Sequence, residues 1–401
     1  MTTPALRLQG LVRLGVATGL WTFGVSLSAP FLDAYLWSLH PSWTLIAEFN
    51  LAQFGAMVVT FPVAGWLARR RGAALPLRCA AVVIAVAVGA FLAFGAAAPR
   101  HVVGLGILLG VGWGLYWLAQ FVLNIDFTQP GPGRDRWQAV AGLMTTAAGL
   151  AAPLAAGILV AAAGRVLGFR WLLSGGLTFL AASLLVAAGL PSAPGGAFPF
   201  RAAVPNRVAD PWGYLLLAHG ALGLRDGVYL FAPALLVFAL SGSVLDLGVY
   251  LAVTQGVSMA TYAAHSRWGG PQWRRPSLLL GAGLSAAVGL VLAAGLTVLH
   301  VWAFGVLTAA LAPLLQVPIE ACTLDLIALR AGTDRAARVS HTVVKEVVVN
   351  AARVVSVSLM IGVLAVAGTA SLRPWLVAVA ATPFIAWWAV SRFPAVLPGP
   401  A

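Results

Sequence analysis

The stretch HTVVKEVVVNAARVVSVSLMIGVLAVAG, from His341 to Gly368, has the length and the apolar content of a membrane-spanning helix. Its first half nevertheless contains an ammonium (Lys345), a carboxylate (Glu346) and a guanidinium (Arg353). Each such group costs about 2.5–3.5 kcal/mol to insert at the centre of a bilayer, so it is expected to face protein or water. The segment therefore predicts a membrane helix with one polar face.

The whole chain has the composition of an all-α polytopic membrane protein. Of its 401 residues, 61% are hydrophobic and 9% are charged, and the mean hydropathy is +0.93. A single soluble core stops growing at roughly 250–300 residues, and the apolar residues form long runs rather than narrow stripes. We expect an uncleaved first helix and twelve transmembrane helices in all, at residues 14–38, 43–68, 76–97, 102–126, 138–163, 171–190, 212–239, 244–265, 276–298, 301–328, 340–366 and 371–391.

The net charge of +13 would suggest a nucleic-acid partner in a soluble protein. The positions of the basic residues indicate a different cause. With a cytoplasmic N-terminus, 17 of the 24 basic residues fall on the inner side of the expected spans and four on the outer side. This bias follows the positive-inside rule. It predicts a multi-pass protein of the inner (cytoplasmic) membrane with both termini in the cytoplasm, and no nucleic-acid partner.

The chain also divides into two halves. The stretch PSAPGGAFPFRAAVPNRVADP at residues 191–211 is rich in proline and glycine, as linkers are, and separates six expected spans from six. A shift of 199 residues aligns IDFTQPGPGRDR (125–136) with LDLIALRAGTDR (324–335). We expect two six-helix pseudo-repeats, at 1–190 and 212–401, joined by a cytoplasmic linker. Such repeats place a substrate site at their interface, near the bilayer midplane.

These features resemble the major facilitator superfamily. The stretch GWLARRRG, Gly65–Gly72, resembles the family's loop signature, although Arg69 stands where the family has an aspartate. The segments GLRDG (223–227) and VVKEVVVNAAR (343–353) resemble a bacterial permease group of unassigned substrate. The resemblance implies the twelve-helix fold, transport by alternating access, and a monomer. It also implies that the Gly65–Gly72 loop belongs to a cytoplasmic gate.

The stretch AAGLAAPLAAG, Ala147–Gly157, resembles the Gly/Pro motif of the family's proton antiporters, with alanines in place of some glycines. This motif favours export. Small residues at this spacing are equally consistent with close packing between helices.

Acidic and basic residues gather at the inner ends of the fourth span of each half. We expect Asp126, Asp135, Asp325 and Asp334 to pair with Arg134, Arg136, Arg335 or Arg338 in a gate that opens during transport; static loop structure is the alternative. The predicted gate comprises Gly65, Arg69, Arg70, Arg71, Gly72, Asp126, Asp135, Arg136, Asp325, Asp334 and Arg335.

The spans of the second half contain three cations and three anions: Arg225, Asp226, Glu320, Lys345, Glu346 and Arg353. Helical spacing places Glu346, Asn350 and Arg353 on one stripe, with Lys345 about 100° away. One interpretation is a salt-bridge network that joins spans 7, 10 and 11. The other is that Arg225 and Arg353 bind an anionic group, supported by Glu320 or Glu346. A carboxylate that loads and releases a proton is compatible with both.

The first half has fewer charges within its spans. Asp33 and Glu48 lie near the outer ends of spans 1 and 2, where they are either a proton-uptake pair or two hydrated carboxylates. Spans 2 and 4 add amides and aromatic rings, which suit either a solute cavity or contacts between helices. The substrate-binding candidates are Arg225, Arg353, Asn350, Glu320, Gln316, Tyr116, Trp117, Gln120, Asn124 and Asn50. The proton-coupling candidates are Asp226, Glu320, Glu346, Asp33 and Glu48.

The sequence does not favour an enzyme, because it contains neither an HExxH nor a GxSxG motif and its histidines are scattered. No metal or cofactor is expected. It also lacks a P-loop, so we expect a secondary active transporter in the lipid bilayer, coupled to protons and specific for a small organic solute, anionic or zwitterionic. An exporter or flippase of lipophilic compounds or lipids is one alternative. A transporter-fold sensor or scaffold is another.

Overall fold

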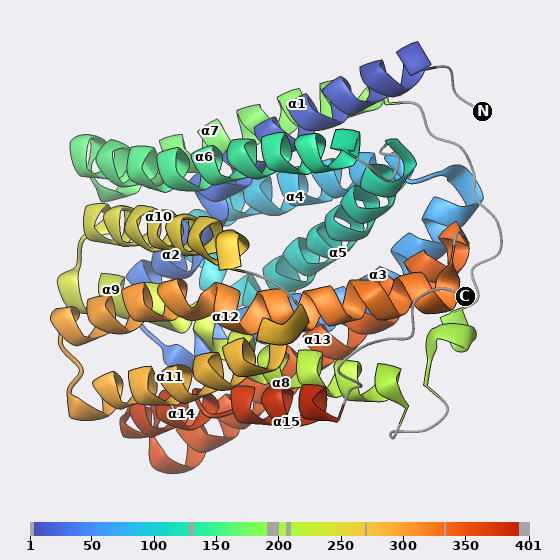
Figure 1. The fold of residues 1–401 in the computed structure, drawn as a ribbon. Coiled ribbons are helices and arrows are strands. Elements are labelled where there is room, and N and C mark those ends of the chain that lie inside the picture. Colours follow the sequence, from blue (N-terminus) through green and yellow to red (C-terminus); the bar gives the residue numbers. More distant parts are fainter. Residues whose placement is uncertain are drawn as a thin grey trace. The chain divides into compact units, whose positions relative to one another are not determined.

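The computed structural model describes residues 4–127, 132–190, 200–205, 210–268, 271–332 and 334–392; within these, the side chains of residues 4–8, 125, 132–141, 143, 202, 268 and 271 are outside the description. Every regular element among the described residues is a helix. The chain forms two compact units, and Figure 1 labels their helices.

The first unit comprises Met1–Ala197 and Gly242–Ala252. Its elements are α1 (Pro4–Ser28), η1 (Ala29–Phe31), α2 (Leu32–Leu39), α3 (Trp43–Arg71), α4 (Ala74–Phe94), η2 (Gly95–His101), α5 (Val102–Phe127), α6 (Pro132–Ala163), α7 (Arg165–Ala188) and the start of α10 (Val244–Trp268).

The second unit comprises Phe198–Ser241 and Val253–Ala401. Its elements are η3 (Phe200–Ala203), α8 (Pro211–Tyr229), α9 (Ala232–Ser241), the rest of α10, η4 (Pro271–Trp273), α11 (Arg274–Ala294), α12 (Val298–Ala331), α13 (Arg335–Ala367), η5 (Thr369–Ser371), α14 (Leu372–Val379) and α15 (Pro383–Ser391).

Eleven helical segments of the described residues are long and apolar enough to cross a membrane. Ten of them each overlap one expected span. The eleventh, Ala74–Asn124, is 51 residues long and contains two expected spans, α4 and α5, joined by η2. The chain is therefore a multi-pass helical membrane protein, whereas the count of twelve spans stays a prediction.

Glycines set the close packing of α5 in the first unit. A Cβ added at Gly106 or Gly110 would collide with backbone carbonyls of α3, and one at Gly112 would lie 2.5 Å from Ile84 of α4. Small residues allow helix backbones to approach closely. Because α3 and α4 occupy two sides of α5, only part of its surface is left for polar and aromatic side chains.

The second unit packs α8 closely against α13. A Cβ at Gly223 would lie 2.6 Å from the carbonyl oxygen of Val349, and one at Gly227 would lie 2.9 Å from the backbone of Arg353. This contact brings the GLRDG segment of α8 beside the polar stripe of α13. Near the start of α8, the indole of Trp212 is fully buried and donates a 2.8 Å hydrogen bond to the carbonyl of Ala203.

Prolines interrupt or bend several of these helices. The first apolar segment of each unit is broken, at η1 with Pro30 and between α8 and α9 just before Pro233. Helix α12 contains Pro318, which has no N–H, so the carbonyl of Leu314 loses its helical donor. The hydroxyl of Ser277 on α11 donates to that carbonyl at 3.4 Å. The neighbouring helix thus satisfies the backbone carbonyl of Leu314, nearly two turns before Glu320.

Candidate functional site

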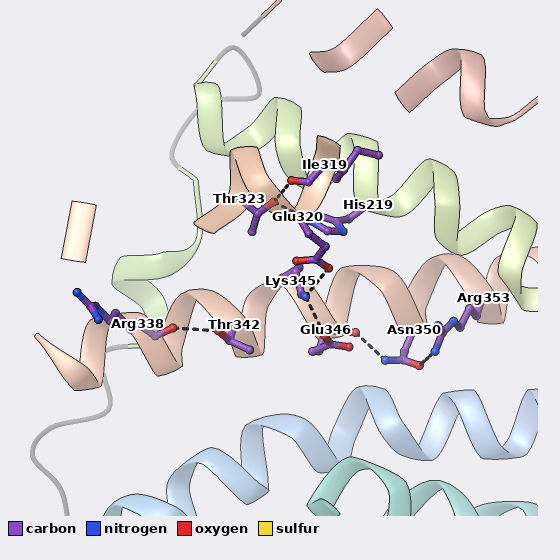
Figure 2. A network of polar contacts seen from close by, with 10 residues as sticks. All are labelled: His219, Ile319, Glu320, Thr323, Arg338, Thr342, Lys345, Glu346, Asn350 and Arg353. Atoms are coloured by element: carbon purple, nitrogen blue, oxygen red, sulfur yellow. Dashed lines mark hydrogen bonds and ion pairs between the residues drawn. The ribbon is translucent and has the colours of Figure 1, made fainter. Parts of the chain in front are cut away.

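The charged residues of α12 and α13 form a group that we call the triad: Glu320, Lys345 and Glu346. The Lys345 ammonium lies 3.0 Å from the Glu320 carboxylate and 3.2 Å from that of Glu346 (Figure 2). Lys345 is 14% exposed, whereas Glu320 is 46% exposed. Because Lys345 projects about 100° away from the stripe of α13, it reaches α12. One cation thus serves two anions and joins two helices.

The stripe of α13 is held by the amide of Asn350, which is fully buried. Its Nδ2 donates to the backbone carbonyl of Glu346 at 2.8 Å, and its Oδ1 accepts from the Arg353 guanidinium at 3.1 Å. The spacing predicted that Asn350 and Arg353 share a face, and the bond between their side chains agrees with it. Asn350 therefore positions the guanidinium of Arg353 along the helix.

Arg225 on α8 binds its own neighbour. Its Nη2 and Nε lie 3.1 and 3.2 Å from Oδ1 of Asp226, and its guanidinium lies over the ring of Tyr229, 5.7 Å from the centroid. The Arg225 side chain is 5% exposed. Asp226 thus compensates the charge of Arg225, and this pair does not join α8 to another helix. The expected charge network therefore joins spans 10 and 11 through the triad, while span 7 has a pair of its own.

A histidine that the sequence analysis set aside connects α8 to α12. His219 Nε2 lies 2.8 Å from the hydroxyl of Thr323, and both residues are buried. That hydroxyl donates its proton to the carbonyl of Ile319 at 2.8 Å. A hydroxyl has a single hydrogen to donate, so Nε2 carries the imidazole proton and donates to Thr323. Its position inside the apolar stretch LLLAHGALG (215–223) was the signal available.

Tyr262 of α10 is a second residue that sequence reasoning missed. Its hydroxyl donates to Oε1 of Gln316 on α12. Gln316 and Glu320 are four residues apart, so they are neighbours on one face of α12. The Tyr262 phenol also lies within electrostatic range of Asp226, Arg225 and Glu320. Helix α10 thus contributes a phenol beside the triad.

In the first unit, Asp33 lies in the first turn of α2 and has an amide partner. Nδ2 of Asn50 on α3 lies 3.0 Å from Oδ1 of Asp33 and 3.0 Å from the carbonyl of Ile46. Asn50 is 5% exposed. Glu48, the other expected proton-coupling residue of this half, is exposed near the start of α3.

The aromatic residues of α5 form a cluster with α1. The rings of Trp21 and Tyr116 are parallel with their centroids 4.0 Å apart, and Trp113 meets both rings edge-on. Trp117 stacks on Trp113 and is 51% exposed. Tyr116 and Trp117 were expected from the sequence. Trp21 and Trp113 were not, because the contacts of Trp21 with the rings of α5 depend on which helices are neighbours.

Amides extend this cluster along α5. Gln120 Nε2 lies 2.9 Å from the hydroxyl of Thr18 on α1, and Asn124 donates to the carbonyl of Gln120 at 2.8 Å. The contact with Thr18 shows that Gln120 faces α1.

The loop signature after α3 forms a helix end. Gly72 terminates α3 with φ of 82°, a conformation that favours glycine. Arg69, Arg70 and Arg71 fill the last turn, where cations interact favourably with the helix dipole. Arg70 lies 4.4 Å above the ring of Trp66, and Gly65 is buried one turn earlier.

Two of the predicted gate pairings are wrong. Asp325 pairs with Arg274 of α11, at 2.6 Å, and not with an arginine of its own loop. Asp334 caps α13 by accepting from the backbone N–H groups of Ala336 and Ala337. Asp334 directly precedes α13, so its carboxylate lies next to the free N–H groups of the first turn. Arg274 is the first residue of the neighbouring helix α11, which places its guanidinium near Asp325.

The remaining gate residues are only partly described. Arg335 lies in the first turn of α13, and Asp126 lies near the end of α5. The side chains of Asp135 and Arg136 fall outside the described residues, as does that of Arg134.

No family model matches the chain. The uncharacterized protein YqgE of Bacillus subtilis (strain 168) is 30% identical over 351 residues, which cover 87% of this chain and 81% of YqgE. The chain belongs to the YqgE family. A protein of Geobacillus stearothermophilus described as an uncharacterized protein in the sodM 3′ region is 36% identical over 168 residues, or 42% of this chain and 75% of that protein.

The fold of this YqgE-family chain is that of the major facilitator superfamily. The crystal structure of the human organic anion transporter MFSD10 (TETRAN) matches it with a TM-score of 0.68 and 14% identity. The match covers 97% of this chain and 100% of the solved chain. The expected superfamily fold is thus confirmed.

Proposed function

We propose that the protein is a secondary active transporter that works by alternating access. The observation that carries this function is Glu320, a carboxylate that is 46% exposed inside an apolar helix of a transporter fold. Hydrocarbon cannot accommodate such a group, so the part of the carboxylate that Lys345 does not cover meets water or a solute. We further propose twelve spans in two six-helix pseudo-repeats, at 1–190 and 212–401, joined by a linker at 191–211. The protein is a monomer in the inner membrane with both termini in the cytoplasm.

Asp33 is the proton-coupling residue in this proposal. A carboxylate that has an ammonium or guanidinium partner is held in its charged form, whereas an amide partner leaves the charge uncompensated. Asp226, Glu320 and Glu346 each lie within 3.2 Å of a cation, whereas the carboxylate of Asp33 accepts from the amide of Asn50. Asp33 also follows the break between α1 and α2, where a half-helix begins, and half-helix ends are where many transporters place coupling sites.

The proposed solute is a small organic molecule that carries a negative charge, either as an anion or as a zwitterion. Arg353, oriented by Asn350, is the candidate for its anionic group. Arg225 is a weaker candidate, because Asp226 already compensates its charge. MFSD10, whose fold this chain shares, is described as an organic anion transporter, and that description is consistent with the proposed negative charge of the solute.

A second candidate function is export of lipophilic compounds. The exposed indole of Trp117, stacked on a cluster of three further rings, favours it, since such a surface binds apolar solutes. The AAGLAAPLAAG stretch adds little support, because its residues pack closely against α10: a Cβ at Gly157 would lie 3.1 Å from Leu245.

Reconstitution into liposomes tests the proposal. Purified protein is placed in vesicles with an imposed pH gradient and supplied with labelled zwitterionic, anionic and lipophilic solutes. We expect uptake or release of a zwitterion or anion that collapses when a protonophore dissipates the gradient. Movement of lipophilic compounds alone would favour the second candidate. A folded protein that binds a solute but moves none would be a sensor and would overturn the transport proposal.

A further inference from the structure

The triad carries an excess of negative charge. Lys345 contributes one positive charge, and it is shared by Glu320 and Glu346 at 3.0 and 3.2 Å. Two carboxylates and one ammonium have a net charge of −1. Arg225 does not offset this charge, because its guanidinium binds Asp226 on its own helix. Arg353 lies about two helical turns beyond Glu346, and its guanidinium donates to Asn350. Since opposite charges attract strongly where water is scarce, the triad favours one additional cation.

The position of Glu320 makes that cation a ligand rather than another side chain. Glu320 lies eleven residues before the end of α12, about 16 Å along the helix axis, and 46% of its side chain is exposed. Its other neighbours on this face are the neutral side chains of Gln316 and Tyr262 (α10). An arriving solute can therefore reach the exposed part of the carboxylate, where it competes with Lys345 for the negative charge.

Tyr262 and Gln316 provide the acceptors that an ammonium requires. The Tyr262 hydroxyl donates its single proton to Gln316, which leaves its lone pairs available to accept from a ligand N–H. The face of a tyrosine ring also attracts a cation. The site therefore offers a charged acceptor, a neutral acceptor and an aromatic face, contributed by α10 and α12.

We propose that Glu320, Tyr262 and Gln316 bind the protonated amine of the transported solute. The ligand is a primary or secondary ammonium, because the carboxylate and the phenol together accept two N–H donors, whereas a tertiary ammonium has one and a quaternary ammonium has none. This inference rests on the proposed transport function and narrows its solute: the molecule is a zwitterion rather than a simple organic anion.

Thermal stabilisation of the detergent-purified full chain tests this site. The probes are amino acids and simple aliphatic and aromatic amines, each run beside its N-acetylated and N-trimethylated forms. Ligands that bind the folded state raise its melting temperature. We expect at least one free amine to stabilise the protein, its N-acetylated form to lose the effect, and its N-trimethylated form to bind about tenfold more weakly. Equal stabilisation by an amine and its N-acetylated form, or none by any amine, overturns the site.

Three variants then separate binding from folding. Glu320→Gln should abolish the amine-dependent shift. Asp325→Asn is the matched control: Asp325 is 48% exposed on the same helix and pairs with Arg274, and we expect its variant to keep the shift. Lys345→Gln should increase amine affinity about tenfold, since it removes the cation that competes for the carboxylates. A misfolded variant cannot produce that gain. An unchanged shift in Glu320→Gln, or weaker binding in Lys345→Gln, contradicts the proposal.

Flux measurements distinguish this inference from the transport function. If an amine binds but the protein moves no solute in liposomes, the ammonium site is supported and the proposed transport function is wrong. Transport of organic anions at equal rates by the wild type and Glu320→Gln keeps the transporter and overturns the ammonium site.

Discussion

The two units hold the carboxylates within their apolar helices in different ways. In the first unit, Asp33 accepts a hydrogen bond from the amide of Asn50. In the second unit, Asp226 binds Arg225, and Glu320 and Glu346 share Lys345. An amide stabilises a carboxylate without neutralising it, whereas a cation does both. The difference indicates a division of roles, with proton exchange at Asp33 and helix bracing together with solute recognition in the second unit.

The largest expected effect is loss of coupling in Asp33→Asn. This variant keeps a hydrogen-bonding side chain of the same size but cannot exchange a proton. Uptake driven by a pH gradient should fall to the level of protein-free liposomes, while exchange of labelled for unlabelled solute at equal pH on both sides continues. Glu48→Gln is the control; because Glu48 is exposed, we expect nearly normal driven uptake. Gradient-driven uptake by Asp33→Asn would remove the coupling role from the first unit.

Arg225→Gln tests the ion pair between Arg225 and Asp226 within α8. Breaking a buried pair leaves one charge without its partner, and we expect a loss of about 3 kcal/mol in unfolding free energy. The double variant Arg225→Gln/Asp226→Asn should recover most of this loss, because it leaves no isolated charge. The measurement is a double-mutant cycle on unfolding in detergent. Equal stability of the single and double variants would mean that the pair braces nothing.

Lys345→Met tests the triad in the same assay. The variant leaves two carboxylates near each other, but Glu320 is half exposed and water screens part of the repulsion. We therefore expect a smaller loss, about 2 kcal/mol. The additional change Glu346→Gln should restore part of the stability by removing one of the two charges. A loss as large as that of Arg225→Gln would show that Glu320 is shielded from water, which would weaken its role in solute recognition.

The smallest expected effect is at His219. His219→Leu removes the donor to Thr323 and should cost about 1 kcal/mol. His219→Gln keeps an N–H donor and should cost less. Because neither change alters the charge of the second unit, transport should continue in both. If His219→Gln had normal stability but did not transport, the imidazole would belong to the proton pathway. Proton exchange would then not be confined to the first unit.

Much of the fold follows from the sequence, because lipid constrains it strongly. Long apolar runs in a membrane must become helices, since only internal hydrogen bonds satisfy the backbone there. Spacing along one helix was equally informative: it predicted a shared face for Asn350 and Arg353, whose side chains are hydrogen-bonded to each other. Predictions of this kind require only the pitch of the helix.

Contacts between helices were predicted less well. Asp325 was expected to pair with an arginine near it in the sequence, but its partner is Arg274, 51 positions away. The contacts of Tyr262 with Gln316 and of His219 with Thr323 had no signal in local spacing. Each depends on which helices are neighbours and on how far each is rotated about its axis.

The sequence alone determined that this chain crosses a membrane as helices and that its second half carries balanced charges inside them, because hydropathy, helical pitch and the cost of burying a charge act locally. Only the tertiary structure decided the partner of each carboxylate: Asp226 has Arg225 to itself, Glu320 and Glu346 share Lys345, and Asp33 has the amide of Asn50. That assignment is what separates bracing, solute recognition and proton exchange, and it depends on which helices are neighbours and on how far each is rotated about its axis.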